Sequence, residues 1–314
     1  MKETIKKYCS KPSIRKFGNY EALLRGAEIA LENYDFESAV LLSGEAIRKE
    51  PEDPSGYQLR GKALYNSMRG SDKAALKDFQ KAAALGTKDG HVFEYLARVA
   101  FDGGDAKRAI EFMNKAIELQ PGQRDFYRYR ASIHHSLKDE LKAEADYNQF
   151  VEVAPEKAFG YILRARFYDG RGQYERALLD YEKAIALTEE TRDDSKRLEK
   201  YALGLKGKAL ALRNLKRYKE SVDTYTRLLQ FKSEADETLR ERGDVYLEMG
   251  KYKRAIEDYS RVIEMMPNLS RTALLSRAEA YEKLGEGELA RADRKKARSQ
   301  REAPAEKHVF DMKM

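Results

Sequence analysis

One segment decides the fold of this 314-residue chain: Arg242-Gly-Asp-Val-Tyr-Leu-Glu-Met-Gly-Lys-Tyr-Lys-Arg-Ala-Ile-Glu-Asp-Tyr259. It places two small residues, Gly243 and Ala255, twelve positions apart, and the aromatic Tyr259 follows four positions later. Small residues let two helix backbones approach closely, and an aromatic side chain fills the space beside such a contact. Gly250 lies between the two amphipathic stretches and suits a turn. The segment therefore predicts two short antiparallel helices.

The same arrangement recurs along the chain, and blocks starting at Gly90, Arg124 and Ala158 follow one another every 34 residues. The paired small residues are Ala27/Ala39, Ala97/Ala109, Ala131/Ala143, Ala165/Ala177, Gly243/Ala255 and Ala278/Ala290, with weaker blocks at Ala63/Ala75 and Ala209/Ser221. Glycines at 103–104, 170, 172, 250 and 285 suit the turns within pairs, and prolines at 51, 121, 155 and 267 suit the ends of second helices. A fixed period of this length is typical of stacked helical repeats.

The sequence resembles tetratricopeptide repeats, a family of 34-residue helix–turn–helix units with these small, aromatic and proline positions. The resemblance covers about residues 20–298, although Phe93, Tyr127 and Tyr161 stand where the family usually has tryptophan. It implies an all-α fold, a right-handed α-solenoid (superhelix) of about eight helix-turn-helix units. Such a solenoid is expected to act as a protein–protein interaction scaffold.

The period also predicts the domain organisation. Residues 1–19 form a basic N-terminal arm with six cations and one anion, residues 20–298 the solenoid, and residues 299–314 a C-terminal tail. One interval between blocks is ten residues too long, which places an insertion at 188–201. We expect it to lengthen two helix ends around a solvated loop, as a bend or as a tolerated surface insertion.

Composition and motifs argue against an enzyme. The single cysteine, Cys9, provides no disulfide framework, and no apolar run is long enough to span a membrane, so we expect a cytoplasmic protein. Lys62 after Gly61 lacks the following Ser or Thr of a phosphate-binding loop. His134 and His135 are adjacent, so they point to different sides of a helix and do not chelate one metal ion easily. We expect neither a catalytic residue nor a cofactor or metal site.

The predicted partner site is the concave groove lined by the first helix of each pair. Nine candidate binding residues fall there: Arg98, Phe101, Arg128, His135, Phe159, Arg166, Lys206, Arg213 and Arg240. Five of the cations recur once per block near the helix middle, so they favour a protein or peptide partner with acidic side chains; they are Arg98, Arg128, Arg166, Lys206 and Arg240. The alternative is that these cations pair with acids within the groove. The family's carboxylate clamp for chaperone tails is not expected, because its Lys and Asn set is missing.

Two further hypotheses stay open. The basic ends, 1–19 and 290–314, suit an RNA-associated factor or an acidic membrane, although aromatic residues are not interleaved with the C-terminal cations. A role of 1–19 in organelle targeting is a smaller possibility, because the arm is cationic but rich in Lys where Arg is usual. Alternatively, groove aromatics such as Phe101 and Phe159 suit a co-chaperone that binds unfolded clients.

Overall fold

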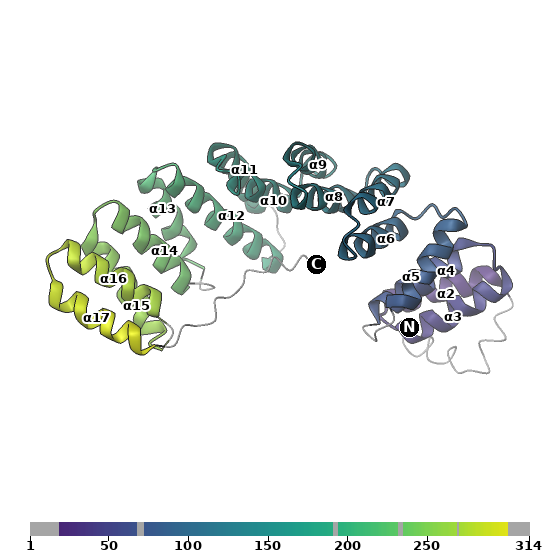
Figure 1. Cartoon of the computed structure of the whole chain (residues 1–314), viewed down its shortest axis with the longest axis horizontal. Helices are drawn as coiled ribbons and strands as arrows, with labels where there is room; N and C mark the ends of the chain where they lie inside the picture. The colour runs from purple at the N-terminus through teal and green to yellow at the C-terminus, as the bar shows by residue number, and fades with distance from the viewer. Residues whose placement is uncertain (1–18, 68–71, 191–193, 232–234, 269, 301–314) are drawn as a thin grey trace. The chain divides into compact units, whose positions relative to one another are not determined.

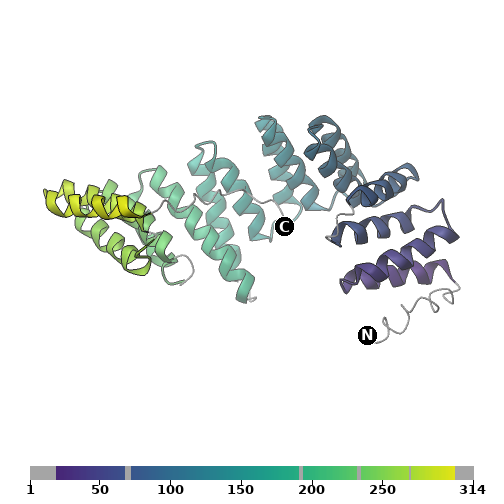
Figure 2. The same cartoon turned by 60° about the horizontal axis from the view of Figure 1, so that its bottom comes forward.

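The computed structural model describes residues 19–67, 72–190, 194–231, 235–268 and 270–300. Regular structure within these ranges is helical throughout, and the sixteen helices follow one another as eight antiparallel pairs (Figures 1 and 2). The all-α solenoid of about eight units is thereby confirmed. Nearly all of the predicted basic arm and tail, and residues 191–193 of the insertion, lie outside the described ranges.

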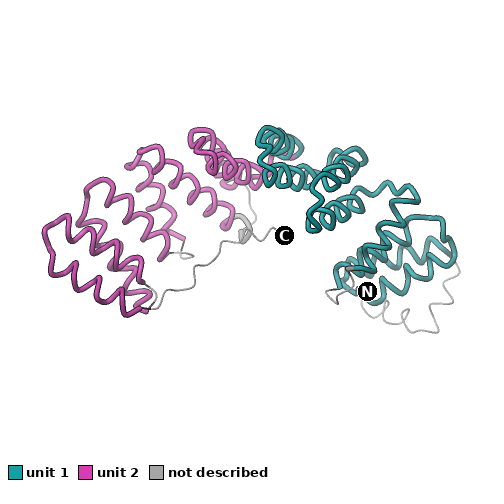
Figure 3. Tube along the Cα trace, viewed as in Figure 1, with its two compact units in different colours: residues 1–153 teal, residues 154–314 magenta. Residues whose placement is uncertain are grey.

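The chain divides into two compact units, residues 1–153 and 154–314 (Figure 3). Unit 1 holds four helix pairs: α2 (Tyr20–Glu32) with α3 (Phe36–Lys49), α4 (Pro54–Asn66) with α5 (Asp72–Ala84), α6 (Gly90–Asp102) with α7 (Ala106–Leu119), and α8 (Arg124–Ser136) with α9 (Glu140–Glu152). Unit 2 holds the other four: α10 (Ala158–Asp169) with α11 (Tyr174–Glu190), α12 (Asp194–Asn214) with α13 (Tyr218–Leu228), α14 (Ala235–Glu248) with α15 (Tyr252–Met265), and α16 (Arg271–Lys283) with α17 (Gly287–Ser299).

Small residues form the contact inside each pair, as predicted. Ala97 and Ala109 are fully buried where α6 meets α7, and Gly243 and Ala255 are buried where α14 meets α15. At the equivalent place in α13, the buried hydroxyl of Ser221 donates to the carbonyl of Ala209 at 2.8 Å. The small side chains at these positions therefore let the two helix backbones of a pair approach closely.

The turns inside the pairs use a left-handed residue wherever the structure describes the turn in full. Gly104 and Gly250 take φ values of 84° and 70° there, which glycine adopts without steric cost. Three pairs lack the glycine, and Tyr34, Lys138 and Lys216 take φ values of 58° to 61° in its place. Aspartates then start several second helices, since Asp35, Asp105 and Asp139 accept hydrogen bonds from backbone N–H groups in the first turn.

Five arginine–aspartate pairs join first helices to second helices. In each, the Nε and Nη2 atoms of the arginine donate to the two carboxylate oxygens of a buried aspartate at 2.6 to 2.9 Å. We call these the Arg–Asp pairs; they are Arg60–Asp78, Arg130–Asp146, Arg164–Asp180, Arg242–Asp258 and Arg277–Asp293. Three of the arginines also bond to the preceding second helix, through Asn114, Thr226 or Ser260. These three side chains therefore tie neighbouring repeats together.

The extra residues between the fifth and sixth pairs are divided between two helices. Helix α11 has 17 residues and α12 has 21, whereas most of the other helices have 13 or 14. The Tyr201 hydroxyl on α12 donates to the Glu189 carboxylate on α11 at 3.0 Å, so the lengthened helix ends contact one another.

Candidate functional site

First helices of neighbouring pairs lie against one another within each unit: α2 contacts α4, α10 contacts α12, and α14 contacts α16. We call the surface formed by the first helices the first-helix face. All nine predicted binding residues lie on first helices; Phe101, His135 and Arg213 each lie one residue before the end of their helix. The structure therefore places all nine on this type of helix, as the period predicted.

On unit 2, carboxylates pair with the predicted cations. Lys206 of α12 donates to Glu237 of α14 at 2.5 Å, and Arg213 of α12 donates to Glu248 of α14 at 2.5 and 2.9 Å. These pairs link two consecutive first helices. The cations are partly covered, with Lys206 27% and Arg213 25% exposed, so the charges are compensated within the face.

Asp244 brings two of the predicted cations together. Its carboxylate lies 3.4 Å from Arg240 and 3.8 Å from Arg213, and it accepts the hydroxyl of Tyr259 at 2.7 Å. Burial first, and then the negative charge of Asp244, raises the pKa of Tyr259 far above its usual value. This tyrosine therefore stays a hydrogen-bond donor to the network.

Glu241 of α14, which the sequence pattern did not indicate, is a further carboxylate near Lys206 and Arg240. Burial raises the pKa of Glu241. The positive charge of Lys206 partly offsets this increase, and the negative charge of Glu237 adds to it. Around α12 and α14 the acids therefore at least match the cations, which supports the alternative that the groove cations pair with groove acids.

The remaining predicted residues of unit 2 lie on α10. Phe159 is half-buried, and Arg166 is exposed. Burial raises the pKa of Asp169, and the hydrogen bond from Tyr181 and the charge of Arg166 partly oppose this effect. The hydroxyl of Tyr181 donates to Asp169 at 2.6 Å. An acid therefore lies near each of the predicted unit 2 cations.

On unit 1, Arg98 of α6 lies between a carboxylate and an aromatic ring. Its Nη2 atom donates to Glu94 at 2.8 Å, and its guanidinium carbon lies 4.9 Å from the centre of the Tyr129 ring on α8. Burial opposes ionisation of Glu94, yet hydrogen bonds from His91 and Arg98 lower its pKa. The arginine is 30% exposed and contacts both a carboxylate of its own helix and a ring of the next first helix.

Aromatic rings continue this arrangement onto α4. Tyr65 of α4 packs edge-on against Tyr95 of α6, with ring centres 4.7 Å apart, and Tyr65 and Tyr129 both act electrostatically on Arg98. Tyr65 is 45% exposed, whereas Tyr95 and Tyr129 are buried. We call Tyr65, Tyr95, Arg98 and Tyr129 the aromatic group. Three consecutive first helices thus contribute to one surface with an exposed phenol.

The other predicted residues of unit 1 lie on the same helices. Phe101 of α6 is half-buried and packs against the core between α6, α7 and α8. Arg128 of α8 donates to Asp125 at 3.3 Å, and the exposed His135 lies 3.2 Å from Glu140 at the start of α9. His134, by contrast, is buried, so the two adjacent histidines do point to different sides of α8.

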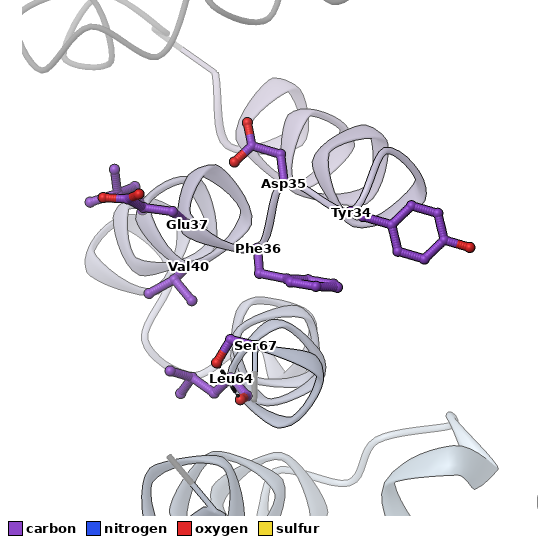
Figure 4. Close-up of a pocket in the computed structure, with 8 residues that line it drawn as sticks. Tyr34, Asp35, Phe36, Glu37, Val40, Leu64 and Ser67 are labelled. Atoms are coloured by element: carbon purple, nitrogen blue, oxygen red, sulfur yellow. Dashed lines mark hydrogen bonds between the residues drawn. The ribbon is translucent and has the colours of Figure 1, made fainter. Parts of the chain in front are cut away.

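A separate cavity of about 450 Å³ lies on unit 1 between the α2–α3 turn and the end of α4. Figure 4 shows Phe36 between that turn and the C-terminal end of α4, where the hydroxyl of Ser67 donates to the Leu64 carbonyl at 2.8 Å. The ring of Tyr34 points away from Leu64 and is 81% exposed. The sequence analysis did not predict this cavity.

Within the described ranges, no three His, Cys, Asp or Glu side chains gather as they would around a metal ion. None of the described helices combines the length and the apolar character that crossing a membrane requires. Cys9 lies outside the described residues.

The fold and the paired helices define an α-solenoid of helical repeats. Family models described as tetratricopeptide repeat match residues 73–124, 96–158, 160–191 and 236–269. The chain is a tetratricopeptide repeat protein, as its sequence pattern indicated.

Two kinds of similarity to known proteins accompany these matches. Over 110 residues the chain is 26% identical to the small glutamine-rich tetratricopeptide repeat-containing protein 2 of Mycosarcoma maydis. That match covers 35% of this chain, and the chain spans only 31% of the relative's length.

Among solved structures, the C-terminal part of a TPR repeat-containing protein from Cytophaga hutchinsonii is similar with a TM-score of 0.65. The sequences are 15% identical, and the match covers 83% of this chain and 99% of that one. The type IV pilus biogenesis factor PilW is similar with a TM-score of 0.51 and 18% identity, over 65% of this chain and 90% of that one. These likenesses show the fold.

Proposed function

We propose that this protein is a non-enzymatic scaffold that binds an extended segment of a partner protein on the first-helix face of unit 1, at the aromatic group. The observation that carries the proposal is the convergence of Tyr65, Arg98 and Tyr129 from three consecutive first helices. Tetratricopeptide repeats generally support protein interactions, and stacked first helices supply a preformed surface, so little ordering cost falls on the scaffold.

Exposure and chemistry favour this place over the equivalent face of unit 2. Aromatic side chains and arginine are the residues that dominate protein interfaces, and Tyr65 offers an exposed phenol beside the Arg98 guanidinium. On unit 2 the cations Lys206, Arg213 and Arg240 already have carboxylates at 2.5 to 3.4 Å. Arg98 of unit 1 also has a carboxylate partner, but it lies in addition against the Tyr129 ring, so aromatic chemistry distinguishes unit 1.

The preference for an acidic partner remains a prediction. Arg98 and Arg128 have carboxylate partners at 2.8 and 3.3 Å, so a partner carboxylate would have to displace Glu94 or Asp125. If acidic residues are recognised, Arg128→Ala and Arg166→Ala weaken capture of the partner. If the aromatic group dominates, both variants bind with little change.

A peptide selection tests the proposal. Random peptides displayed on phage are selected on the full chain, and the Kd of each enriched peptide is measured by calorimetry at low and high salt. We expect enriched peptides to carry an apolar or aromatic residue and to lose little affinity with salt. Failure to enrich any peptide, or binding that vanishes in salt, contradicts the proposal. The second result would favour a charge-driven partner such as RNA.

The cellular setting is part of the proposal. The single cysteine suits a reducing compartment, so we propose that the scaffold acts in the cytoplasm. Fractionation of cells with an antibody against the chain tests this directly.

A further inference from the structure

The Arg–Asp pairs offer a comparison between repeats of the same chain. Four residues after the paired arginine, on the same face of the first helix, three repeats carry tyrosine: Tyr168, Tyr246 and Tyr281. The guanidinium carbon of Arg242 lies 5.8 Å from the Tyr246 ring centre, and that of Arg277 lies 5.7 Å from the Tyr281 ring centre. The other two repeats with Arg–Asp pairs carry Leu64 and His134 instead.

A cavity of about 350 Å³ borders His134. Its walls include Ile110 and Asn114 of α7, Arg130 of α8, and Lys142 and Asp146 of α9. Two of the three helices are second helices, so the cavity is distinct from the first-helix face and from the aromatic group. Its volume lies at the small end of the range for ligand pockets, roughly 300–1,000 Å³, which suits a single side chain.

The repeat formed by α14 and α15 has the same polar groups, an arginine bonded to an aspartate and to the preceding second helix, and it carries a tyrosine beside them. We call these three groups the polar frame. Arg242 donates to Asp258 and to Thr226 there, as Arg130 donates to Asp146 and to Asn114 at the cavity.

The apolar wall corresponds as well. Val222 precedes Arg242 by twenty residues, as Ile110 precedes Arg130, and the Tyr246 ring packs against the apolar cluster that contains Val222. The cavity therefore lies where a repeat with tyrosine places a phenol ring.

His134 does not complete this frame. It is only 6% exposed, and its Nδ1 atom makes no hydrogen bond with any residue that the structure describes. The nearest carboxylate oxygens, from Asp139 and Asp146, lie 4.0 Å from its two ring nitrogens. Burial lowers the pKa of His134, although these carboxylates oppose the effect, so the ring is neutral near pH 7.

The charges around the cavity are balanced. Arg130 is paired with Asp146, and Lys142 lies 2.8 Å from Asp139, so no excess positive charge remains for a phosphate or carboxylate. A neutral aromatic ring with one polar substituent matches an arginine face, an apolar wall and several hydrogen-bonding groups.

We propose that this cavity binds a tyrosine side chain of a partner protein, which supplies from outside the ring that Tyr246 supplies from within its own repeat. The second cavity of unit 1 borders Leu64, which follows Arg60 by four residues and likewise stands where other repeats have tyrosine. This cavity, too, lies at a repeat without the internal phenol.

N-acetyl-tyrosinamide, which presents the side chain as a protein does, is the probe for the test. It is titrated into the ¹⁵N-labelled full chain, and amide shifts are followed by TROSY spectra. We expect saturable shifts in the millimolar range at Ile110, Asn114 and Lys142. N-acetyl-phenylalaninamide, which lacks the hydroxyl, should bind more weakly.

The matched variant is His134→Tyr, which should fill the cavity from within and keep the fold, because three repeats already carry tyrosine there. His134→Phe serves as a second filling variant if the first does not fold. Both should abolish the saturable shifts. The proposal is overturned if the wild-type chain shows no saturable shifts, if they persist in a folded filling variant, or if the phenylalanine probe binds equally well. Because the readout lies on α7 and α9, it is independent of peptide binding at the aromatic group.

Discussion

Asp258 of α15 accepts two hydrogen bonds from Arg242 of α14, at 2.8 and 2.7 Å, and its side chain is only 5% exposed. The third donor used, Nη1 of Arg242, reaches Thr226 of the preceding repeat at 2.9 Å. One guanidinium therefore holds two helices of its own repeat and one helix of the previous repeat. A solenoid is stabilised by such contacts between neighbours, because each repeat touches only the repeats beside it.

Removing one member of this pair leaves a buried charge without a partner. We expect Asp258→Ala to lower the free energy of unfolding by about 3–5 kcal/mol. The control is Glu257→Ala in the same helix, since Glu257 pairs with Arg254 at 3.2 Å while both side chains are more than 60% exposed. That loss should stay below about 1 kcal/mol. Urea unfolding of the two variants checks this, and equal losses would contradict the structural role of the pair.

Gly243 stands where most other blocks have alanine, and the structure gives the reason. A Cβ atom on Gly243 would lie 2.7 Å from the ring of Tyr259, a fully buried side chain. Gly243→Ala should therefore destabilise the fold by about 1–3 kcal/mol. Gly44→Ala in α3 is the opposite case, because its nearest neighbour is the tip of Arg60 at 4.0 Å. It should stabilise by roughly 0.5–1 kcal/mol. Thermal unfolding followed by circular dichroism distinguishes the two.

Left-handed turn residues offer a paired test of backbone strain. Lys216 has a φ of 60° at the turn where Gly250 has a φ of 70° in another pair. Lys216→Gly should raise the free energy of unfolding by roughly 0.5–1 kcal/mol, and Gly250→Ala should lower it by about 1 kcal/mol. Denaturant midpoints measure both. A loss of stability in the first variant would mean that the lysine side chain contributes more than its backbone costs.

Stability should fall in alkali because of buried tyrosines. Burial is the main cause that raises the pKa of Tyr129 to about 12, from a usual value of 10. The unfolded chain ionises first, so the contribution of Tyr129 is complete below pH 10 and is lost as the pH rises toward 12. Tyr129→Phe should lose less stability over this window than the wild-type chain. Denaturant unfolding between pH 9 and 11.5 measures the difference, and parallel curves would contradict the assignment.

Much of the fold could be predicted because small residues recur at the positions where the two helices of a pair contact each other. Ala97, Ala109 and Gly243 mark helix contacts, and Gly104 and Gly250 mark turns, so residue types report geometry there. The period does not report turns where Tyr34, Lys138 or Lys216 replaces glycine, since these residues give no signal for a positive φ.

The candidate site was predicted less completely. The period identified the helices that carry Arg98, Arg213 and Arg240, but the acids that pair with them come from other turns or other repeats. Asp244 and Glu248 lie more than thirty residues from Arg213, so only the stacking of repeats shows the pairing. The Arg–Asp pairs did have a signal, because in four blocks the aspartate follows the arginine by sixteen residues.

The aromatic group and the cavity at His134 arise from contacts between helices of different repeats. Tyr65 and Tyr95 lie thirty residues apart and meet edge-on only in the folded chain. His134 indicates a cavity only when it is compared with Tyr168 and Tyr246, which occupy the equivalent position in other repeats. Both features depend on distances between helices that a sequence period alone does not give.

The central claim is that a partner segment binds at the aromatic group, and the most direct measurement is the Kd of a selected peptide for Tyr65→Ala. Tyr34→Ala is the control, because Tyr34 is a more exposed tyrosine of the same unit, 81% against 45%, and lies in the turn between α2 and α3, outside the aromatic group. We predict that Tyr65→Ala weakens binding at least about tenfold, or about 1.4 kcal/mol, while Tyr34→Ala leaves the Kd unchanged. Unchanged binding in a folded Tyr65→Ala variant would contradict the account.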